Sequence, residues 1–204
     1  MKIAHFALTG YGNHVLTALS EAGHRPQVIV TRSEPGPFPY YPCPNIGVAA
    51  SEHGIPVMIG EDGERFVADR EWDLILVSGY HRVLNEALLG KASHAINLHP
   101  SLLPKYRGAN PFFWALHNKE SETGVSAHKL TTELDQGEIY GQLVCSIGNG
   151  WDENRLRREL GELAARLAVE VVKDIAAGTL VGTAQDESQA TYCPPRGAER
   201  ELRK

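Results

Sequence analysis

Residues 73–78 form a near-continuous apolar run, Asp-Leu-Ile-Leu-Val-Ser. Such a run is typical of a central strand in a parallel sheet, because helices cover both faces of that strand. Three earlier segments also have the character of strands: 2–9, 27–31 and 56–59. Helical patterns lie between them, around 15–19, 45–53 and 61–70. This alternation predicts an α/β fold with a mostly parallel, twisted sheet flanked by helices.

A later strand-like segment carries polar side chains at its end. In the stretch Ala-Ile-Asn-Leu-His at 95–99, the alternation places Asn97 and His99 on one face. Pro100 disfavours a helix and lacks an amide proton, so the strand is predicted to stop there. Asn97 and His99 then lie at the carboxyl end of a strand, where open α/β sheets bind ligands. Taken singly, each also fits an ordinary role, as a turn cap and as a hydrogen-bonded core histidine.

The residues around this strand end resemble the signature of the folate-dependent formyltransferases, which comprise glycinamide ribonucleotide, methionyl-tRNA and amino-sugar branches. The family pattern is Asn-x-His-Pro-Ser-Leu-Leu-Pro, followed by an aromatic residue, Arg or Lys, and Gly. Here it reads Asn97 to Pro104 and then Tyr-Arg-Gly at 106–108. A second block, 124–137, also resembles the family, in which a histidine seven residues ahead of the catalytic aspartate opens the folate-contacting loop. Standing alone, Asp-x-Gly at 135–137 would indicate only a turn.

The resemblance implies one Rossmann-like formyltransferase domain over residues 1–196, followed by a charged tail at 197–204. It also implies formyl transfer from N10-formyltetrahydrofolate to an amine, without a metal, by Asn97, His99 and Asp135. The chemistry calls for the same groups. An amide can donate to the developing oxyanion, and an imidazole of near-neutral pKa can exchange the amine proton. A carboxylate can orient that imidazole, directly or through water.

Two loops are expected to hold the folate. Gly79 directly follows the buried strand at 73–78, and glycine at such a point permits close approach by a ligand. The folate-binding residues implied by the resemblance are Gly79, Tyr80, His81, Arg82, Val83, Leu84, His128, Thr131, Thr132, Glu133 and Leu134. Among these, a histidine in the position of His81 is more often a loop histidine than a ligand-contacting one.

The acceptor side is less constrained. Residues 10–13, Gly-Tyr-Gly-Asn, lie between a strand and a helix, where exposed amides can bind phosphate. The Gly-x-Gly-x-x-Gly fingerprint is incomplete because position 15 is Val, so a tight βα turn explains the segment equally well. The candidate acceptor-binding residues are Gly10, Gly12, Asn13, Ser101, Arg107, Gly108 and Asn110. Residues 33–44 hold five prolines and form a long loop, whose Tyr40 and Tyr41 either stack on a ligand or pin the loop.

The second half of the chain predicts four more elements: a helix at 111–118, strands at 123–130 and 139–147, and a long helix at 152–178. Phe112 to Trp114 are expected mostly in the core, with one able to line the acceptor site. Asp152 is a good N-cap, and the leucines that follow it repeat at three and four residues, as on an amphipathic helix. Residues 190–196 resemble the end of the catalytic domain in the tRNA and sugar branches.

Charge and cysteine content limit the kinds of binding partner that this sequence predicts. The 20 basic and 25 acidic residues give a net charge of −5, which argues against a nucleic-acid surface. The three cysteines lie far apart, so neither a disulfide framework nor a cysteine zinc site is indicated. No signal-peptide pattern and no 18-residue apolar stretch occurs. The sequence therefore predicts a cytoplasmic protein without a membrane partner, and it leaves a homodimer open.

The acceptor is expected to be a small-molecule amine, with an amino-sugar nucleotide or another small amine favoured. The tRNA branch carries a C-terminal β-barrel that this sequence stops short of. The ribonucleotide branch has a longer phosphate turn, so glycinamide ribonucleotide is the alternative. Residues 107–111 with Trp114 are most similar to the sugar and small-amine branches, although many sugar enzymes have an additional C-terminal dimerisation segment.

Two other activities stay open. A hydrolase could release formate from the same donor, although such relatives usually carry an N-terminal regulatory domain and none precedes the first strand here. A non-catalytic folate-binding module is a third class, against which the intact Asn97, His99 and Asp135 argue.

Overall fold

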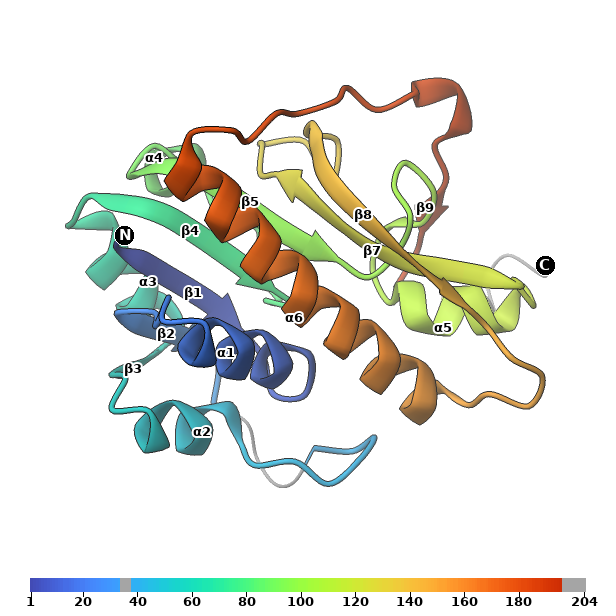
Figure 1. The fold of residues 1–204 in the computed structure, drawn as a ribbon, viewed down its shortest axis with the longest axis horizontal. Coiled ribbons are helices and arrows are strands. Elements are labelled where there is room, and N and C mark those ends of the chain that lie inside the picture. Colours follow the sequence, from blue (N-terminus) through green and yellow to red (C-terminus); the bar gives the residue numbers. More distant parts are fainter. Residues whose placement is uncertain (34–37, 196–204) are drawn as a thin grey trace.

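The computed structural model describes residues 1–33 and 38–195 (Figure 1). Part of the proline-rich loop, 34–37, and the charged tail expected at 197–204 lie outside the described residues. The elements in chain order are β1 (Ile3–Ala7), α1 (Tyr11–Glu21), β2 (Val28–Thr31), α2 (Ile46–Glu52), β3 (Val57–Ile59), α3 (Gly60–Ala68), β4 (Trp72–Ser78), α4 (Glu86–Leu89), β5 (Ala92–His99), β6 (Arg107–Gly108), α5 (Pro111–His117), β7 (Glu122–Lys129), β8 (Ile139–Ser146), α6 (Glu153–Ala177), the 3₁₀ helix η1 (Glu187–Gln189) and β9 (Tyr192–Cys193).

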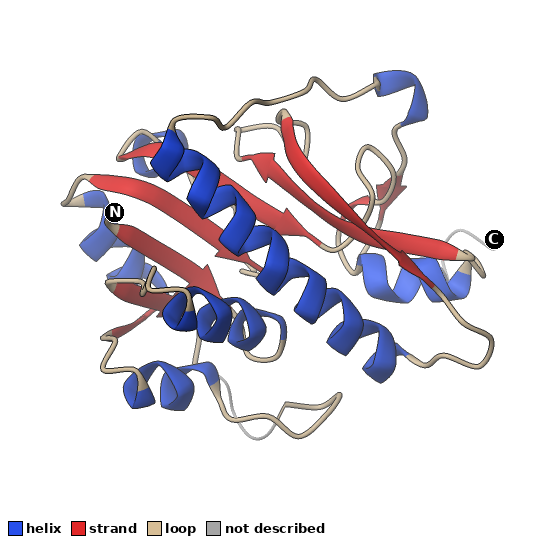
Figure 2. Cartoon of the chain, viewed as in Figure 1, coloured by secondary structure: helices blue, strands red, loops and turns tan. Residues whose placement is uncertain are grey.

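Seven strands form one sheet in the order β3-β2-β1-β4-β5-β7-β8 (Figure 2). The five strands from β3 to β5 are parallel, and β7 and β8 extend the sheet in antiparallel fashion. The predicted α/β fold with a mostly parallel sheet is confirmed. The chain winds outward from β1 to β3 and then returns to place β4 on the other side of β1. Ligands bind outside the carboxyl ends of the strands at such a reversal.

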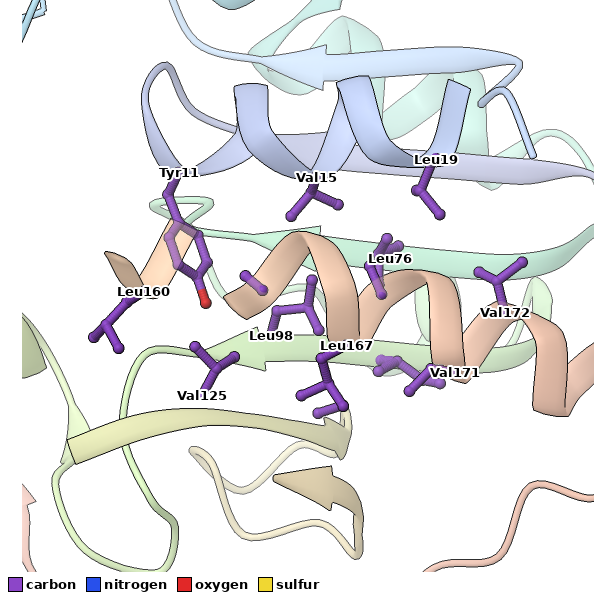
Figure 3. Close-up of a cluster of buried hydrophobic side chains, with 14 of the residues drawn as sticks. Tyr11, Val15, Leu19, Leu76, Leu98, Val125, Leu160, Leu167, Val171 and Val172 are labelled. Carbon is purple, nitrogen blue, oxygen red and sulfur yellow. The ribbon is translucent and has the colours of Figure 1, made fainter. Parts of the chain in front are cut away.

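Helices cover both faces of the sheet, as the apolar run in β4 predicts. Leu74 and Leu76 point to the face packed by α1 and α6, whereas Ile75 and Val77 point to the face packed by α3 and α4. Figure 3 shows the first of these interfaces, where Val15 of α1 and Leu167 of α6 meet Leu98 of β5. The central strand β4 is therefore buried on both faces, which leaves its carboxyl end for a site.

The long helix α6 begins and ends where its sequence signals lie. The Asp152 carboxylate accepts a hydrogen bond from the Arg155 amide at 2.8 Å, as an N-cap does. Gly178 follows the last turn with φ of 68°, a left-handed conformation that glycine adopts without strain. Between them, the face carrying Leu156 and Leu160 is buried, whereas Leu163 is only half-buried. No helix among the described residues is both long and apolar enough to cross a membrane.

The segment after α6 runs back across the molecule, drawn red in Figure 1, and ends beside the loop that follows β5. There β9 pairs with β6 in parallel, with Arg107 opposite Tyr192 and Gly108 opposite Cys193. The Trp114 indole donates a hydrogen bond to the Pro194 carbonyl at 2.9 Å. We call residues 178–195 the C-terminal strap. Neither β6 nor the return of the strap was expected from the sequence.

Candidate functional site

Asn97 of β5 and His128 of β7 face each other across the antiparallel ladder. Asn97 Nδ2 lies 3.1 Å from His128 Nε2, and His128 Nδ1 lies 2.9 Å from the Lys129 carbonyl oxygen. A carbonyl only accepts, so Nδ1 carries a proton, and in the neutral ring Nε2 accepts from the Asn97 amide. This contact fixes the orientation of the Asn97 side chain and leaves its second N–H free to donate.

His99, two residues further along β5, is also held through one nitrogen. His99 Nε2 donates a hydrogen bond to the Tyr106 carbonyl at 2.8 Å, so Nδ1 is the nitrogen left for chemistry. His99 Nδ1 lies 3.6 Å from Asp135 Oδ2, which is longer than a hydrogen bond but close enough for strong attraction once Nδ1 carries a proton. Asn97 and His99 thus share a strand face, as the alternation predicted.

Asp135 lies in the loop between β7 and β8, and three groups surround its carboxylate. Oδ2 accepts a hydrogen bond from the Gly108 amide at 2.8 Å and faces His99, while Oδ1 lies 3.4 Å from His128 Nε2. The Asp135 backbone has φ of 54°, in the left-handed region. The structure therefore brings together the three candidate catalytic residues, although the sequence separates the first and last by 38 positions.

Burial and charge set the ionisation of this group. Burial alone would raise the pKa of the Asp135 carboxyl, but His99, His128 and the Gly108 amide together hold it well below its ordinary value. Burial lowers the pKa of His99, and the attraction of Asp135 opposes that effect without cancelling it. At neutral pH the site therefore holds a carboxylate beside a neutral imidazole, whose Nδ1 can accept a proton.

A cavity of about 920 Å³ opens at the carboxyl ends of the parallel strands. Asn97, His99 and Asp135 all line it. Of the eleven residues predicted to bind folate, all but Thr132 line it as well. Val83 and Leu134 are unusual among them, because these large apolar side chains are 73% and 50% exposed. An apolar surface inside a cleft is typical of a ligand site.

Of the residues predicted to bind the acceptor, only some line the cavity. Gly108 and Asn110 line the cavity, but Gly10, Gly12 and Asn13 do not. The Gly10 amide donates to Asn13 Oδ1 at 2.8 Å, and a methyl group on Gly10 would lie only 2.3 Å from Cζ of Phe38. The amide that would hold a phosphate is thus already bonded, and an aromatic ring covers it. The structure favours the tight βα turn over the phosphate-binding turn.

Ser101 and Arg107 also lie outside the cavity lining. Ser101 Oγ donates to the Lys105 carbonyl at 2.7 Å, which closes the turn after β5. The Arg107 side chain is fully buried and forms a bidentate pair with Glu187, at 2.8 and 2.7 Å. Both side chains are therefore engaged within the protein and away from the cavity, and their role in binding the acceptor stays a prediction.

Several lining residues were not predicted as site residues. The two arginines among them are Arg32, directly after β2, and Arg157, on α6. Arg32 follows the carboxyl end of a parallel strand, so the rule for α/β sheets could have found it. No local signal marks Arg157, because only the packing of α6 against the sheet brings it there. Its guanidinium lies 3.8 Å from the Tyr40 ring centroid and 4.3 Å from that of Phe112.

The two tyrosines of the proline-rich loop have different places. Tyr40 lines the cavity, whereas Tyr41 is buried against His14, with its hydroxyl 3.3 Å from His14 Nε2. Tyr41 thus pins the loop, and Tyr40 is free to contact a ligand. Phe112 lines the cavity while Trp114 is buried outside it, which fits the expectation that one of the aromatic residues of α5 would do so.

Comparison with known proteins identifies relatives of this chain. Residues 60–172 match the family described as formyl transferase. The methionyl-tRNA formyltransferase of Citrifermentans bemidjiense is 32% identical over 95% of this chain and 64% of its own length. That of Geobacter metallireducens is 36% identical over 88% of this chain and 60% of its own length. The chain therefore spans less than two thirds of these curated relatives.

Solved structures share the fold. An N-formyltransferase from Helicobacter canadensis, in complex with folinic acid and dTDP-3-aminofucose, superposes with a TM-score of 0.77 at 17% identity, covering 96% of this chain and 71% of that one. Glycinamide ribonucleotide transformylase 1 from Symbiobacterium toebii gives 0.74 at 22% identity, covering 91% and 94%. At these identities the likeness establishes the fold alone.

Proposed function

Because the chain belongs to the formyl transferase family, we propose that it transfers the formyl group of N10-formyltetrahydrofolate to a primary amine. One observation carries the proposal: Asn97, His99 and Asp135 converge at the wall of a single large cavity. An amide donor, a neutral imidazole and a buried carboxylate are the groups that acyl transfer to an amine requires.

The geometry suggests how each group acts. The amine nitrogen attacks the formyl carbon, and the free N–H of Asn97 donates to the oxygen that becomes negative. His99 Nδ1 accepts the proton that the attacking amine loses, since its Nε2 is occupied by the Tyr106 carbonyl. Asp135 stabilises the resulting imidazolium. The carbon–N10 bond then breaks, and the proton passes to the departing N10.

The folate is proposed to lie against the loops at 79–84 and 128–134. Their exposed Val83 and Leu134 offer apolar surface that a flat heteroaromatic ring can cover. Backbone groups at Gly79 can approach such a ring closely because glycine has no Cβ.

For the acceptor we favour a small-molecule amine with a planar or apolar part. Phe38 covers the turn at Gly10, which argues against a phosphate bound at the start of α1 and so against glycinamide ribonucleotide. Tyr40 and Phe112, both in contact with the Arg157 guanidinium, offer a stacking surface in the same cavity. An amino-sugar nucleotide meets this description, and its phosphates could pair with Arg32.

Methionyl-tRNA is the second candidate acceptor. The named activity of the curated relatives favours it, whereas the net charge of −5 argues against a nucleic-acid partner. The proposed chemistry is the same for both acceptors, so only a direct comparison separates them.

The test is a formylation assay with N10-formyltetrahydrofolate and, separately, amino-sugar nucleotides, glycinamide ribonucleotide and methionyl-tRNA. Tetrahydrofolate release is followed together with the mass of the product. We expect formylated product with an amino-sugar nucleotide or another small amine. Formate release without any amine would instead indicate a hydrolase, and folate binding without turnover would indicate a binding module.

Variants of the site complete the test. Asn97→Ala and His99→Ala should each lower kcat by about 10²-fold or more, the scale of a lost oxyanion donor. Binding of a folate analogue, measured by calorimetry, should persist. His94→Ala is a matched control, because His94 lies on the same strand outside the cavity lining. Near-normal turnover in either site variant would show that the assigned roles are incorrect.

A further inference from the structure

Gln185 lies in the C-terminal strap, far from the site in sequence and outside the cavity lining. We propose that Gln185 is a positioning residue, which holds the turn at 135–137 and thereby keeps the Asp135 carboxylate beside His99. This inference rests on the proposed function, because it assigns Gln185 a part in the same reaction.

The first observation is the set of bonds made by the Gln185 amide nitrogen. Gln185 Nε2 donates to the Asp135 carbonyl at 2.8 Å and to the Gly137 carbonyl at 2.7 Å. A carboxamide nitrogen has two hydrogens, and both are used on this turn. The side chain therefore bridges the two ends of the turn that carries the candidate catalytic carboxylate.

The second observation concerns the other end of the carboxamide. Gln185 Oε1 accepts from Arg107 Nη2 at 2.7 Å and from Arg107 Nε at 3.2 Å. The guanidinium is itself fixed by its bidentate pair with Glu187 and by a bond to the Tyr192 hydroxyl at 3.2 Å. All hydrogen-bonding positions of Gln185 are thus occupied, and only a carboxamide offers two donors and two acceptors in this arrangement.

The third observation is that the residue next to Arg107 is hydrogen-bonded to the Asp135 side chain. Gly108, the next residue, donates its amide to Asp135 Oδ2 at 2.8 Å. Gln185 therefore restrains the Asp135 backbone carbonyl directly, and it restrains the Asp135 carboxylate indirectly, through Arg107 and the adjacent Gly108. Asp135 also has φ of 54°, a left-handed conformation that is uncommon outside glycine, although Asp adopts it more readily than most residues.

Loss of Gln185 should release the turn without removing any group that touches a substrate. The titratable groups facing Asp135 are His99 from β5, His128 from β7 and Cys193 from β9. The attraction between Asp135 and His99 raises the pKa of His99 against the effect of burial. If the carboxylate moves away, that contribution shrinks, so the pKa of His99 should fall further below its wild-type value.

The experiment compares Gln185→Ala and Gln185→Glu with wild type. Gln185→Glu keeps the size and the pairing with Arg107 but sets an acceptor against two carbonyls, so it remains informative if Gln185→Ala does not fold. Gln189→Ala is the control, since Gln189 is an exposed glutamine of the same strap. For each protein we would measure kcat, folate-analogue affinity, thermal unfolding and the His99 pKa by NMR of labelled histidine.

We expect kcat to fall by about 10- to 100-fold in both Gln185 variants, because a displacement near 1 Å costs on that order. Folate affinity should stay within about twofold, and the His99 pKa should fall. In an Asp135→Asn background, Gln185→Ala should add little, as expected for residues that act as one unit. The control should match wild type.

Unchanged kcat and His99 pKa in both variants would overturn the inference. So would a loss of activity that only follows a loss of folded protein, with the His99 pKa unmoved. Failure of the proposed function can be distinguished from failure of the Gln185 inference. In the first case wild type would formylate no amine, while the NMR titration would still report whether Gln185 positions Asp135. If wild type is active and the Gln185 variants match it in kcat and His99 pKa, only the positioning role is rejected and the proposed function stands.

Discussion

His99 presents only one of its ring nitrogens to chemistry. The Tyr106 carbonyl occupies Nε2, and the carboxylate of Asp135 faces Nδ1. Asn97 is restrained in a similar way by His128, which was predicted as a folate residue and which here also orients the amide. Each group of the site is thus aimed by a hydrogen bond to a neighbour outside the candidate catalytic set.

A second histidine, His5 in the middle of β1, is fully buried and bonded through Nε2 to Ser78 Oγ at 2.7 Å. Burial lowers the pKa of His5 to about 3, well below its value in an unfolded chain. Below pH 6.5 the unfolded chain takes up a proton at this residue and the folded protein does not. Stability from this group is therefore complete above pH 6.5 and is lost as the pH falls towards 3.

We predict that wild type loses roughly 2–3 kcal/mol more stability between pH 7 and pH 4.5 than His5→Gln, which keeps a partner for Ser78 but does not titrate. Urea unfolding at the two pH values measures the difference. His117→Gln, at the exposed end of α5, should retain the wild-type pH dependence. Equal losses in wild type and His5→Gln would contradict the assignment.

Among the elements, the β6–β9 pair is short but connects the site to the strap. The Arg107 and Ala109 amides donate to the Thr191 and Cys193 carbonyls at 2.8 and 3.1 Å. Gly108 makes the close approach feasible, because it has φ of 97° and a Cβ there would lie 2.6 Å from the Cys193 carbonyl oxygen. A two-residue strand thus depends on one glycine.

Gly108→Ala should therefore destabilise the protein by about 1–3 kcal/mol and speed hydrogen exchange of the Arg107 and Ala109 amides. Gly178→Ala is the matched comparison, since its φ is 68° but no atom lies within 4 Å of the added methyl group. Gly178→Ala should lower the free energy of unfolding by about 1–2 kcal/mol through the backbone conformation alone. The Arg107 and Ala109 amides should stay protected from exchange. Similar exchange in the two variants would argue against a special role for the pair.

At the scale of the whole molecule, α6 covers the junction between the parallel strands and the antiparallel extension. Its buried face packs against α1 on one side and β7 on the other (Figure 3). The helix also carries Arg157 to the cavity, so packing of the core and construction of the site depend on the same element.

Leu160→Ala should cost about 2–5 kcal/mol in urea unfolding, because Leu160 is fully buried and its removal leaves a cavity. Leu163→Ala should cost clearly less, since Leu163 is half-buried one turn further along. An equal cost for the two would mean that α6 does not bury the face described above.

The parallel core of the fold was predictable from local signals. The apolar run in β4, the alternation in β5 and the cap at Asp152 each mark their element, because burial and backbone geometry act on neighbouring residues. The local sequence could not show that Phe38 lies against the turn at residues 10–13, because Phe38 comes from a separate loop. The short β6 gave no periodicity to detect.

The sequence alone determined the α/β class, the order of the main elements and the identity of Asn97, His99 and Asp135 as candidates. The class and the elements depend on periodicity and caps along the chain, whereas the three candidates came from the resemblance of residues 97–108 and 124–137 to a known family. Only the tertiary structure decided that Arg107 faces inward to Glu187 and that Gln185 holds the turn of Asp135. Contacts between positions 50 to 80 residues apart depend on where separate elements pack, and no local pattern encodes them.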